Sequence, residues 1–207
     1  VLGSLGHRDF RSGLYEVVKH AVLEGPALFQ QLETGIALLA PGNIDALESV
    51  LPRAVKVKVD VVNRDERERS LRLTLNLGHT FGHALEEATH YRRFLHGEAV
   101  GWGLLAVVRL GERLRLLAPE EAARITGLVR QLGPLPSIRD LSASRVLRLL
   151  PQDKKSVGGN IQWVIPERIG KVRVVSDVPR SAVAAAFRDI QEMAPSSWKA
   201  ARDREEA

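Results

Sequence analysis

The stretch RLTLNLGHTFGHALEEATHYRRFLHGEAVGWGLL runs from Arg72 to Leu105 and contains four of the chain's six histidines. Its apolar spacing predicts two helices, over about 75–90 and 95–116. His79 and His83 are four residues apart, so on the first helix they face the same way. Two imidazoles at this spacing can bind one divalent ion. The stretch therefore predicts a helical domain with a candidate metal site.

The segments before this stretch are also expected to be helical. Ser12 is a candidate N-cap for a helix through GLYEVVKHAVLE, which Gly25-Pro26 would stop, and a second helix is expected over about 27–39. Asn43 is the next candidate cap, with a helix break expected at Pro52. The alternation in VKVKVDVV is typical of a strand, but we predict a helix there because both neighbouring segments are helical.

The segments after it are expected to end in a different structure. Pro119, followed by two acidic residues, is typical of a helix start, and a short helix is expected to end near Leu150. The two apolar runs in NIQWVIPERIGKVRVVSDV predict a β-hairpin that turns at 166–170, and SAVAAAFRDI predicts a closing helix. In helix 95–116, the glycines at 101 and 103 would permit close helix packing. We predict a mainly α domain over residues 1–192 with a small C-terminal β-hairpin, and a flexible tail over 193–207.

Composition excludes several classes of protein. The 207-residue chain has no cysteine, so it has no disulfide, thiolate zinc site or cysteine nucleophile. No apolar run reaches the roughly 18–20 residues of a membrane span, and no signal segment is present, so we expect a cytoplasmic protein without a membrane partner. Basic and acidic residues nearly balance, giving +5, and aromatics are few, so no nucleic-acid partner is expected. A modest positive excess suits an enzyme whose substrate carries phosphate or carboxylate.

The residue types around the histidines do not decide whether a metal site is present. His96 comes 13 residues after His83 and is followed by Glu98, as in half of a deaminase signature, but the required cysteine pair is absent. A zinc site with so few histidines usually includes a carboxylate, for which Glu16 is a candidate. Lys19 follows one turn later, so an exposed Glu–Lys helix pair is the alternative. Spacing does not decide between them.

Four motifs together resemble a known family. RSGLYEVVKHAVL, then Lys58 through LNLGHTFGHALE, then HGEAVGWG, then DKKSVGGNIQWVIPERIG closely resemble the C-terminal half of 3-dehydroquinate synthases, in the family's order over roughly residues 1–176. The resemblance implies a mainly helical metal-binding domain. In the family, an N-terminal nucleotide-binding domain precedes it, and the active site lies in the cleft between the two. That domain is absent from this sequence, which also does not begin with methionine, so we expect a fragment.

The resemblance also implies roles for individual residues. Glu16, His79 and His96 would bind Zn²⁺ or Co²⁺, while His83 would face the substrate rather than the metal. The carboxylate, hydroxyl and phosphate groups of the substrate would be held by Lys19, Lys58, Arg72 and Asn76, with His83, Lys19 and Lys58 as the catalytic set. In the DKK motif, Lys155 is the expected anion contact and Lys154 the alternative.

The activity that the resemblance implies is that of a lyase of the shikimate pathway. It would convert 3-deoxy-D-arabino-heptulosonate 7-phosphate, a seven-carbon keto-acid phosphate, to 3-dehydroquinate and phosphate. NAD⁺ would be bound mainly by the absent half, so we expect the isolated chain to be inactive and the full-length enzyme to be a homodimer. The alternatives are another sugar-phosphate cyclase, which makes a cyclitol or aminoglycoside precursor, and a non-catalytic metal-binding or interaction remnant. Metal-dependent polyol dehydrogenases share the architecture but are not expected to share these motifs.

Overall fold

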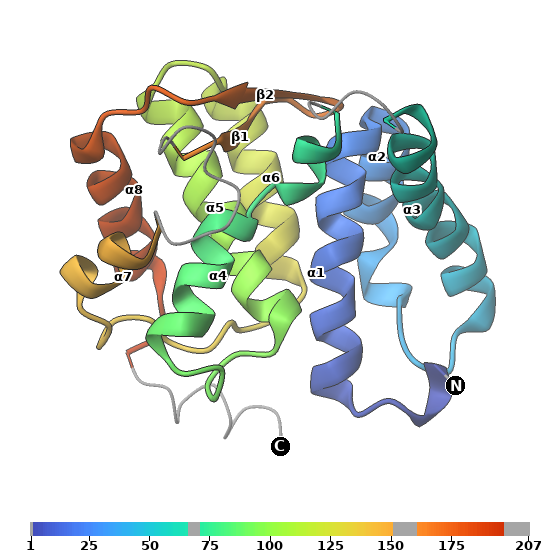
Figure 1. Cartoon of the computed structure of the whole chain (residues 1–207). Helices are drawn as coiled ribbons and strands as arrows, with labels where there is room; N and C mark the ends of the chain where they lie inside the picture. Colours follow the sequence, from blue (N-terminus) through green and yellow to red (C-terminus); the bar gives the residue numbers. More distant parts are fainter. Residues whose placement is uncertain (1, 66–70, 151–160, 197–207) are drawn as a thin grey trace.

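The computed structural model describes residues 2–65, 71–150 and 161–196, and it is mainly helical (Figure 1). In chain order its elements are η1 (Leu2–Ser4), α1 (His7–Glu24), α2 (Pro26–Gly35), η2 (Ile36–Leu38), α3 (Ile44–Arg64), η3 (Arg72–Asn76), α4 (His79–Ala88), α5 (His96–Arg113), α6 (Pro119–Gln131), α7 (Ala143–Leu149), β1 (Trp163–Arg168), β2 (Lys171–Val175) and α8 (Arg180–Met193), where η is a 3-10 helix. The predicted mainly α class with a C-terminal hairpin is confirmed. Within these ranges, no helix is both long and apolar enough to span a membrane.

Helix α5 is the central element of the core. It packs against α1, α4, α6, α8 and β1, and nearly all of its residues are buried. In Figure 1, α1–α3 lie on one side of the α4–α5 pair and α7–α8 on the other. A Cβ at Gly103 would lie 1.8 Å from the carbonyl oxygen of Gly78, so the backbones of α4 and α5 touch here. The predicted close packing at Gly103 is confirmed. At Gly101 a Cβ would lie 2.9 Å from the ring of Tyr15 on α1.

The start of α1 differs from the prediction. The helix begins at His7 with Gly6 as its N-cap, so Ser12 is a helical residue and not the cap. The side chain of Ser12 is buried, and its Oγ accepts a hydrogen bond of 3.1 Å from the backbone N–H of Gly97. A Cβ at Gly97 would lie 1.8 Å from the carbonyl oxygen of Ser12. A serine that looks like a local cap thus makes a long-range contact that brings the first turn of α5 against α1.

Helix α3 confirms two predictions and corrects a third. Asn43 caps it by accepting a hydrogen bond of 3.2 Å from the N–H of Ala46, and the VKVKVDVV segment is helical. The predicted break at Pro52 is wrong, because the helix runs through it. Pro52 removes the N–H that would bond to the carbonyl of Glu48. Both residues are exposed, so water can satisfy that carbonyl.

The predicted helix over 75–90 is shorter than expected. The 3-10 turn η3 ends at Asn76, and Gly78 then adopts a left-handed conformation with φ of 80° before α4 starts at His79. The sequence between Leu75 and Gly78 is therefore a bend and not the first turn of one long helix. This bend sets His79 at the very start of α4.

The hairpin is confirmed, but its turn is tighter than predicted. Pro166 pairs with Val172 inside the antiparallel ladder, and the chain reverses at Ile169 and Gly170. A two-stranded sheet has only edge strands, which tolerate proline. The N–H of Gly170 donates to the carbonyl of Val22 at 2.8 Å, which fastens the turn to α1. The hairpin thus lies across one end of the helices (Figure 1). Of the predicted tail over 193–207, residues 197–207 are outside the described residues.

Candidate metal centre

Three helices bring a carboxylate and two imidazoles together. Glu16 lies in the middle of α1, while His79 and His96 are the first residues of α4 and α5. One side-chain ligand atom from each residue lies within 4.8 Å of those of the other two. The Oε1 atom of Glu16 is 3.6 Å from Nε2 of His79 and 3.9 Å from Nε2 of His96. Residues separated by up to 80 positions in sequence therefore converge at one point.

Among the residues that the structure describes, the Oε1 atom of Glu16 has no hydrogen-bond partner. It is buried, whereas Oε2 of the same carboxylate accepts from Nζ of Lys19 at 2.8 Å. A buried carboxylate oxygen without a partner is costly, because it has lost water and gained nothing in return. An ion between this oxygen and the two Nε2 atoms would satisfy it. The donor set, one carboxylate and two imidazoles, suits zinc or another divalent transition ion.

The protonation states of Glu16 and His79 suit ligation. Burial and the neighbouring charge of Lys19 lower the pKa of His79 to about 4, so its imidazole is neutral at neutral pH. Burial raises the pKa of Glu16, but the charge and hydrogen bond of Lys19 outweigh this and hold it below its usual value. The backbone carbonyl of Leu77 lies 3.2 Å from Nδ1 of His79. A carbonyl can only accept, so Nδ1 carries the proton and Nε2 is left with its lone pair toward Glu16.

His83 lies beside this group but outside it. Its ring centroid is 5.5 Å from that of His79 and 6.0 Å from that of His96. His83, Glu86 and His96 form a second group with ligand atoms within 4.8 Å of one another. In that group, both carboxylate oxygens of Glu86 are already within hydrogen-bond distance of His96. Of the two overlapping groups, only the one with Glu16 contains the unpartnered buried oxygen.

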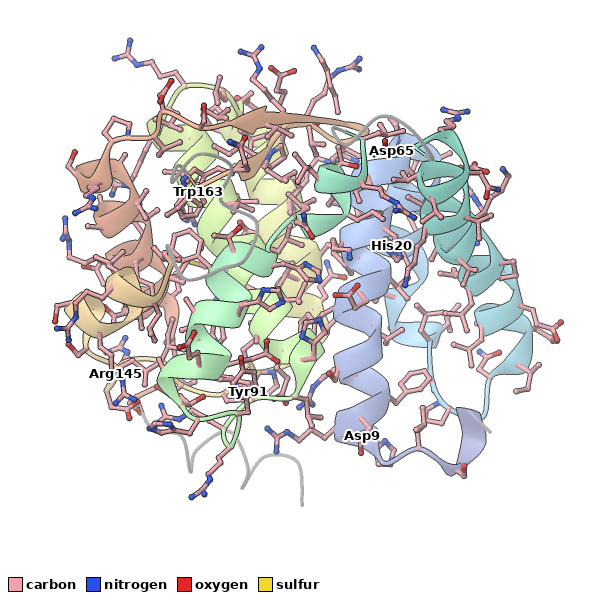
Figure 2. All side chains as sticks on the ribbon, in the orientation of Figure 1. Asp9, His20, Asp65, Tyr91, Arg145 and Trp163 are labelled. Carbon is pink, nitrogen blue, oxygen red and sulfur yellow. The ribbon has the colours of Figure 1, made fainter. Side chains whose placement is uncertain are left out.

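Lys19 connects the three-residue group to the 3-10 turn η3. Its side chain is buried, and its ammonium bonds to Glu16 and to the carbonyl of Leu75 at 3.1 Å. Arg72 and Asn76 are the first and last residues of this same turn, which packs against α1 and α3. The backbone N–H of Arg72 donates to Oδ2 of Asp65, at the end of α3 (Figure 2), while its side chain is exposed.

Lys58 lies on α3, which packs against α1. Its side chain is exposed, yet its charge contributes to the low pKa of His20 on α1, which burial and Lys19 bring to about 4. Figure 2 shows His20 on the side of α1 that faces α3. The charges of Lys58 and Lys19 thus both act on the imidazole of His20. The DKK lysines, Lys154 and Lys155, lie outside the described residues.

The roles of two carboxylates near the site, Glu98 and Glu86, were not predicted from the sequence. Glu98 of the HGE motif is not a ligand: its carboxylate accepts from Nε and Nη2 of Arg8 at 2.7 and 2.8 Å and from the N–H of Leu95 at 2.8 Å. It fastens the start of α5 to α1. The other is Glu86, whose partner His96 is ten residues away. Its position, three residues after His83 on the same helix face, was the only available signal.

The fold and this donor set define a mainly helical domain with a candidate metal site. Residues 13–156 match the family described as 3-dehydroquinate synthase C-terminal, and the chain belongs to that family. The 3-dehydroquinate synthase of Solibacter usitatus is 39% identical over 188 residues, which cover 91% of this chain and 53% of that protein. The enzyme of Koribacter versatilis is 40% identical over 191 residues, covering 92% and 52%. The chain thus spans about half the length of the curated relatives that it matches.

Solved structures of sugar-phosphate cyclases have the same fold. ValA, a 2-epi-5-epi-valiolone synthase from Streptomyces hygroscopicus with NAD⁺ and Zn²⁺ bound, is 29% identical with a TM-score of 0.82, over 93% of this chain and 54% of ValA. A 2-deoxy-scyllo-inosose synthase complexed with carbaglucose-6-phosphate, NAD⁺ and Co²⁺ has a TM-score of 0.72, over 90% of this chain and 53% of that protein. At 19% identity, the second likeness shows the fold alone.

Proposed function

We propose that this chain is the metal- and substrate-binding half of a 3-dehydroquinate synthase, which acts on 3-deoxy-D-arabino-heptulosonate 7-phosphate in the shikimate pathway. The observation that carries the proposal is the buried, unpartnered Oε1 of Glu16 facing Nε2 of His79 and of His96. These three residues would hold Zn²⁺ or Co²⁺. The ion would polarise a substrate oxygen, and NAD⁺, held mainly by an N-terminal domain, would accept and return a hydride.

The chain's own residues would bind and orient the substrate. Lys19 and Lys58 supply two positive charges that both act on His20, and Arg72 adds a third at η3. Ammonium and guanidinium groups bind phosphate and carboxylate through charge-assisted hydrogen bonds. We assign the substrate's anionic groups to these side chains, with Asn76 on a hydroxyl group and Lys155 or Lys154 as a further anion contact.

His83 would exchange protons with the bound substrate. Its ring lies next to His79 and His96, on the same helix as His79 and one turn further on, so it borders the metal group without belonging to it. An imidazole can both accept and donate protons in a reaction. Lys19, which bonds directly to Glu16, would be the nearest fixed positive charge to an oxygen bound at the ion. The full-length enzyme would be a homodimer.

The curated relatives favour 3-dehydroquinate synthase over another cyclase, because their identity of 39–40% exceeds the 29% of ValA. The alternative is a cyclase whose sugar phosphate lacks the carboxylate. The test uses the 207-residue chain mixed with a separately expressed N-terminal half of a relative such as the Solibacter usitatus enzyme, with Zn²⁺ and NAD⁺. We expect phosphate release from the seven-carbon keto acid, none from a sugar phosphate without a carboxylate, and none from the 207-residue chain alone.

Two results of the same assay would contradict the proposal. Preferred turnover of the sugar phosphate would point to the other cyclases. Zinc-dependent turnover by the isolated chain, lost in His79→Ala, would show that the division of labour between the two halves is wrong.

A further inference from the structure

Glu86 is a buried carboxylate with no role in the proposed reaction. It lies on α4, which also carries His79, and only 7% of its surface is exposed. Its Oε1 and Oε2 atoms lie 3.2 and 3.4 Å from Nδ1 of His96, on the next helix. Burial of a carboxylate is unfavourable unless a partner compensates for the lost water. The imidazole of His96 is that partner.

The two nitrogens of His96 face different carboxylates. Nδ1 faces Glu86, whereas Nε2 lies 3.9 Å from Oε1 of Glu16. An ionised carboxylate only accepts, so Nδ1 must carry the proton that it shares with Glu86. In the neutral imidazole, the lone pair of Nε2 is then directed toward the metal group. The other tautomer would place an N–H there, and a flipped ring would place a ring carbon there; neither can bind a metal ion.

His96 needs such an anchor more than His79 does. The side chain of His79 is 13% exposed and its Nδ1 is held by the carbonyl of Leu77, two residues earlier in the sequence. The side chain of His96 is 51% exposed, so packing alone restricts its ring less. The hydrogen bond to Glu86 supplies the missing restriction from a different helix.

We propose that Glu86 is a positioning residue: it fixes the tautomer and ring orientation of His96 so that Nε2 ligates the ion. The inference rests on the metal site of the proposed function. Carboxylates that accept from a ligating histidine typically change metal affinity about 10–100-fold when they are removed. The rival arrangement is a second metal ion between His83, Glu86 and His96, which would need Nδ1 to be deprotonated.

The first measurement is a Co²⁺ titration of the purified 207-residue chain, followed by the visible absorption of the bound ion. We expect one ion per chain, a dissociation constant about 10–100-fold higher in Glu86→Ala, and a smaller increase in Glu86→Gln, whose amide oxygen still accepts from Nδ1. Glu87→Gln, which changes the neighbouring acidic residue, should match the wild type. Thermal unfolding of each variant by circular dichroism shows which of them fold, and the isosteric Gln variant keeps the test decisive if the Ala variant does not.

The second measurement separates positioning from a merely structural role. Long-range ¹H–¹⁵N NMR spectra of the Zn²⁺-loaded chain report which ring nitrogen of His96 carries the proton. We expect a protonated Nδ1 with slow exchange in the wild type and Glu86→Gln, and rapid exchange or loss of Nε2 ligation in Glu86→Ala. If the wild type binds no ion, the proposed function fails. If it binds one ion, lost in His79→Ala, while Glu86→Ala keeps wild-type affinity and spectra, this inference alone is wrong. Two ions per wild-type chain, one of them lost in Glu86→Ala, would overturn it in favour of the second metal site.

Discussion

Glu16 and His79 approach each other to 3.6 Å between Oε1 and Nε2, a separation too long for a hydrogen bond and suited to two atoms that share an ion. Each group has its other polar atom occupied: Oε2 of Glu16 by Lys19, and Nδ1 of His79 by the carbonyl of Leu77. The two atoms that remain face each other. The predictions below follow from this arrangement and from the contacts that maintain it.

Glu16→Gln should remove metal binding while leaving the chain folded. The amide is a weak ligand, and Lys19 would lose its anionic partner and place an uncompensated charge beside the ion. We expect affinity for Zn²⁺ to fall by more than the ~10–100-fold typical of an outer carboxylate. Isothermal titration calorimetry measures it. The control is Glu24→Gln on the same helix, whose carboxylate pairs with Arg53 and accepts from the N–H of Leu28, away from the metal group. An equal loss there would mean that the effect is not local.

Gly97→Ala should separate the two sides of the site. The added methyl group would lie 1.8 Å from the carbonyl oxygen of Ser12, so α1 and α5 must move apart, and with them Glu16 and His96. We expect lower stability, by ~2 kcal/mol or more, and weaker metal binding. Gly13→Ala is the matched control, since a Cβ there meets nothing within 4 Å. In a helix that change should be neutral or stabilise by up to ~1 kcal/mol. Equal melting temperatures for both variants would contradict the account.

Arg8→Ala should destabilise the chain through Glu98. That carboxylate is 1% exposed and loses two hydrogen bonds, of 2.7 and 2.8 Å. From the described residues it keeps the bond from the N–H of Leu95, and the carbonyl of Arg93 also loses its bond from Arg8. Because Arg8 itself is about one-third exposed, we expect a loss of about 2 kcal/mol, below the ~3–5 kcal/mol for a fully buried pair. Arg113→Ala breaks an exposed pair with Asp189 at the other end of α5 and should cost no more than about 1 kcal/mol. Urea unfolding of the two variants gives the comparison.

The metal-free chain should lose stability as the pH falls below neutral. The pKa of His20 is about 4 in the folded chain and about 6.5 when unfolded, so between these values only the unfolded state binds the proton. Stability is therefore complete above pH 6.5 and decreases toward pH 4. From His20 alone we expect a loss of about 2 kcal/mol by pH 5. In His20→Gln, the difference between the free energies of unfolding at pH 7 and pH 5 should shrink by about that amount, leaving the part due to His79; an unchanged difference would refute the assignment.

The sequence predicted the features that depend on contacts between neighbouring residues. It failed for those that depend on contacts between residues far apart in the chain. The helices around LNLGHTFGHALE and HGEAVGWG, the Asn43 cap and the hairpin follow local rules and were predicted. The predictions at Ser12 and Pro52 were wrong because the roles of both residues depend on the tertiary structure. Ser12 bonds to α5, and Pro52 lies on an exposed face of α3, where the helix tolerates it.

The prediction of the metal ligands was limited in the same way. Local spacing favoured His79 and His83 as a ligand pair, since they are one turn apart. The structure instead joins His79 to His96 and Glu16, on two other helices. Motif resemblance supplied that set, because spacing within one helix carries no information on which helices meet. Glu86 was missed for the same reason, since its partner lies on the following helix.

The most direct test of the central claim is a crystal structure of the 207-residue chain soaked with Zn²⁺, with anomalous scattering measured at the zinc edge. The account predicts one strong anomalous peak per chain, about 2.0–2.2 Å from Oε1 of Glu16 and from Nε2 of His79 and His96, with His83 unligated. A peak ligated by His83 and Glu86 instead, or no peak at these residues under saturating zinc, would contradict it.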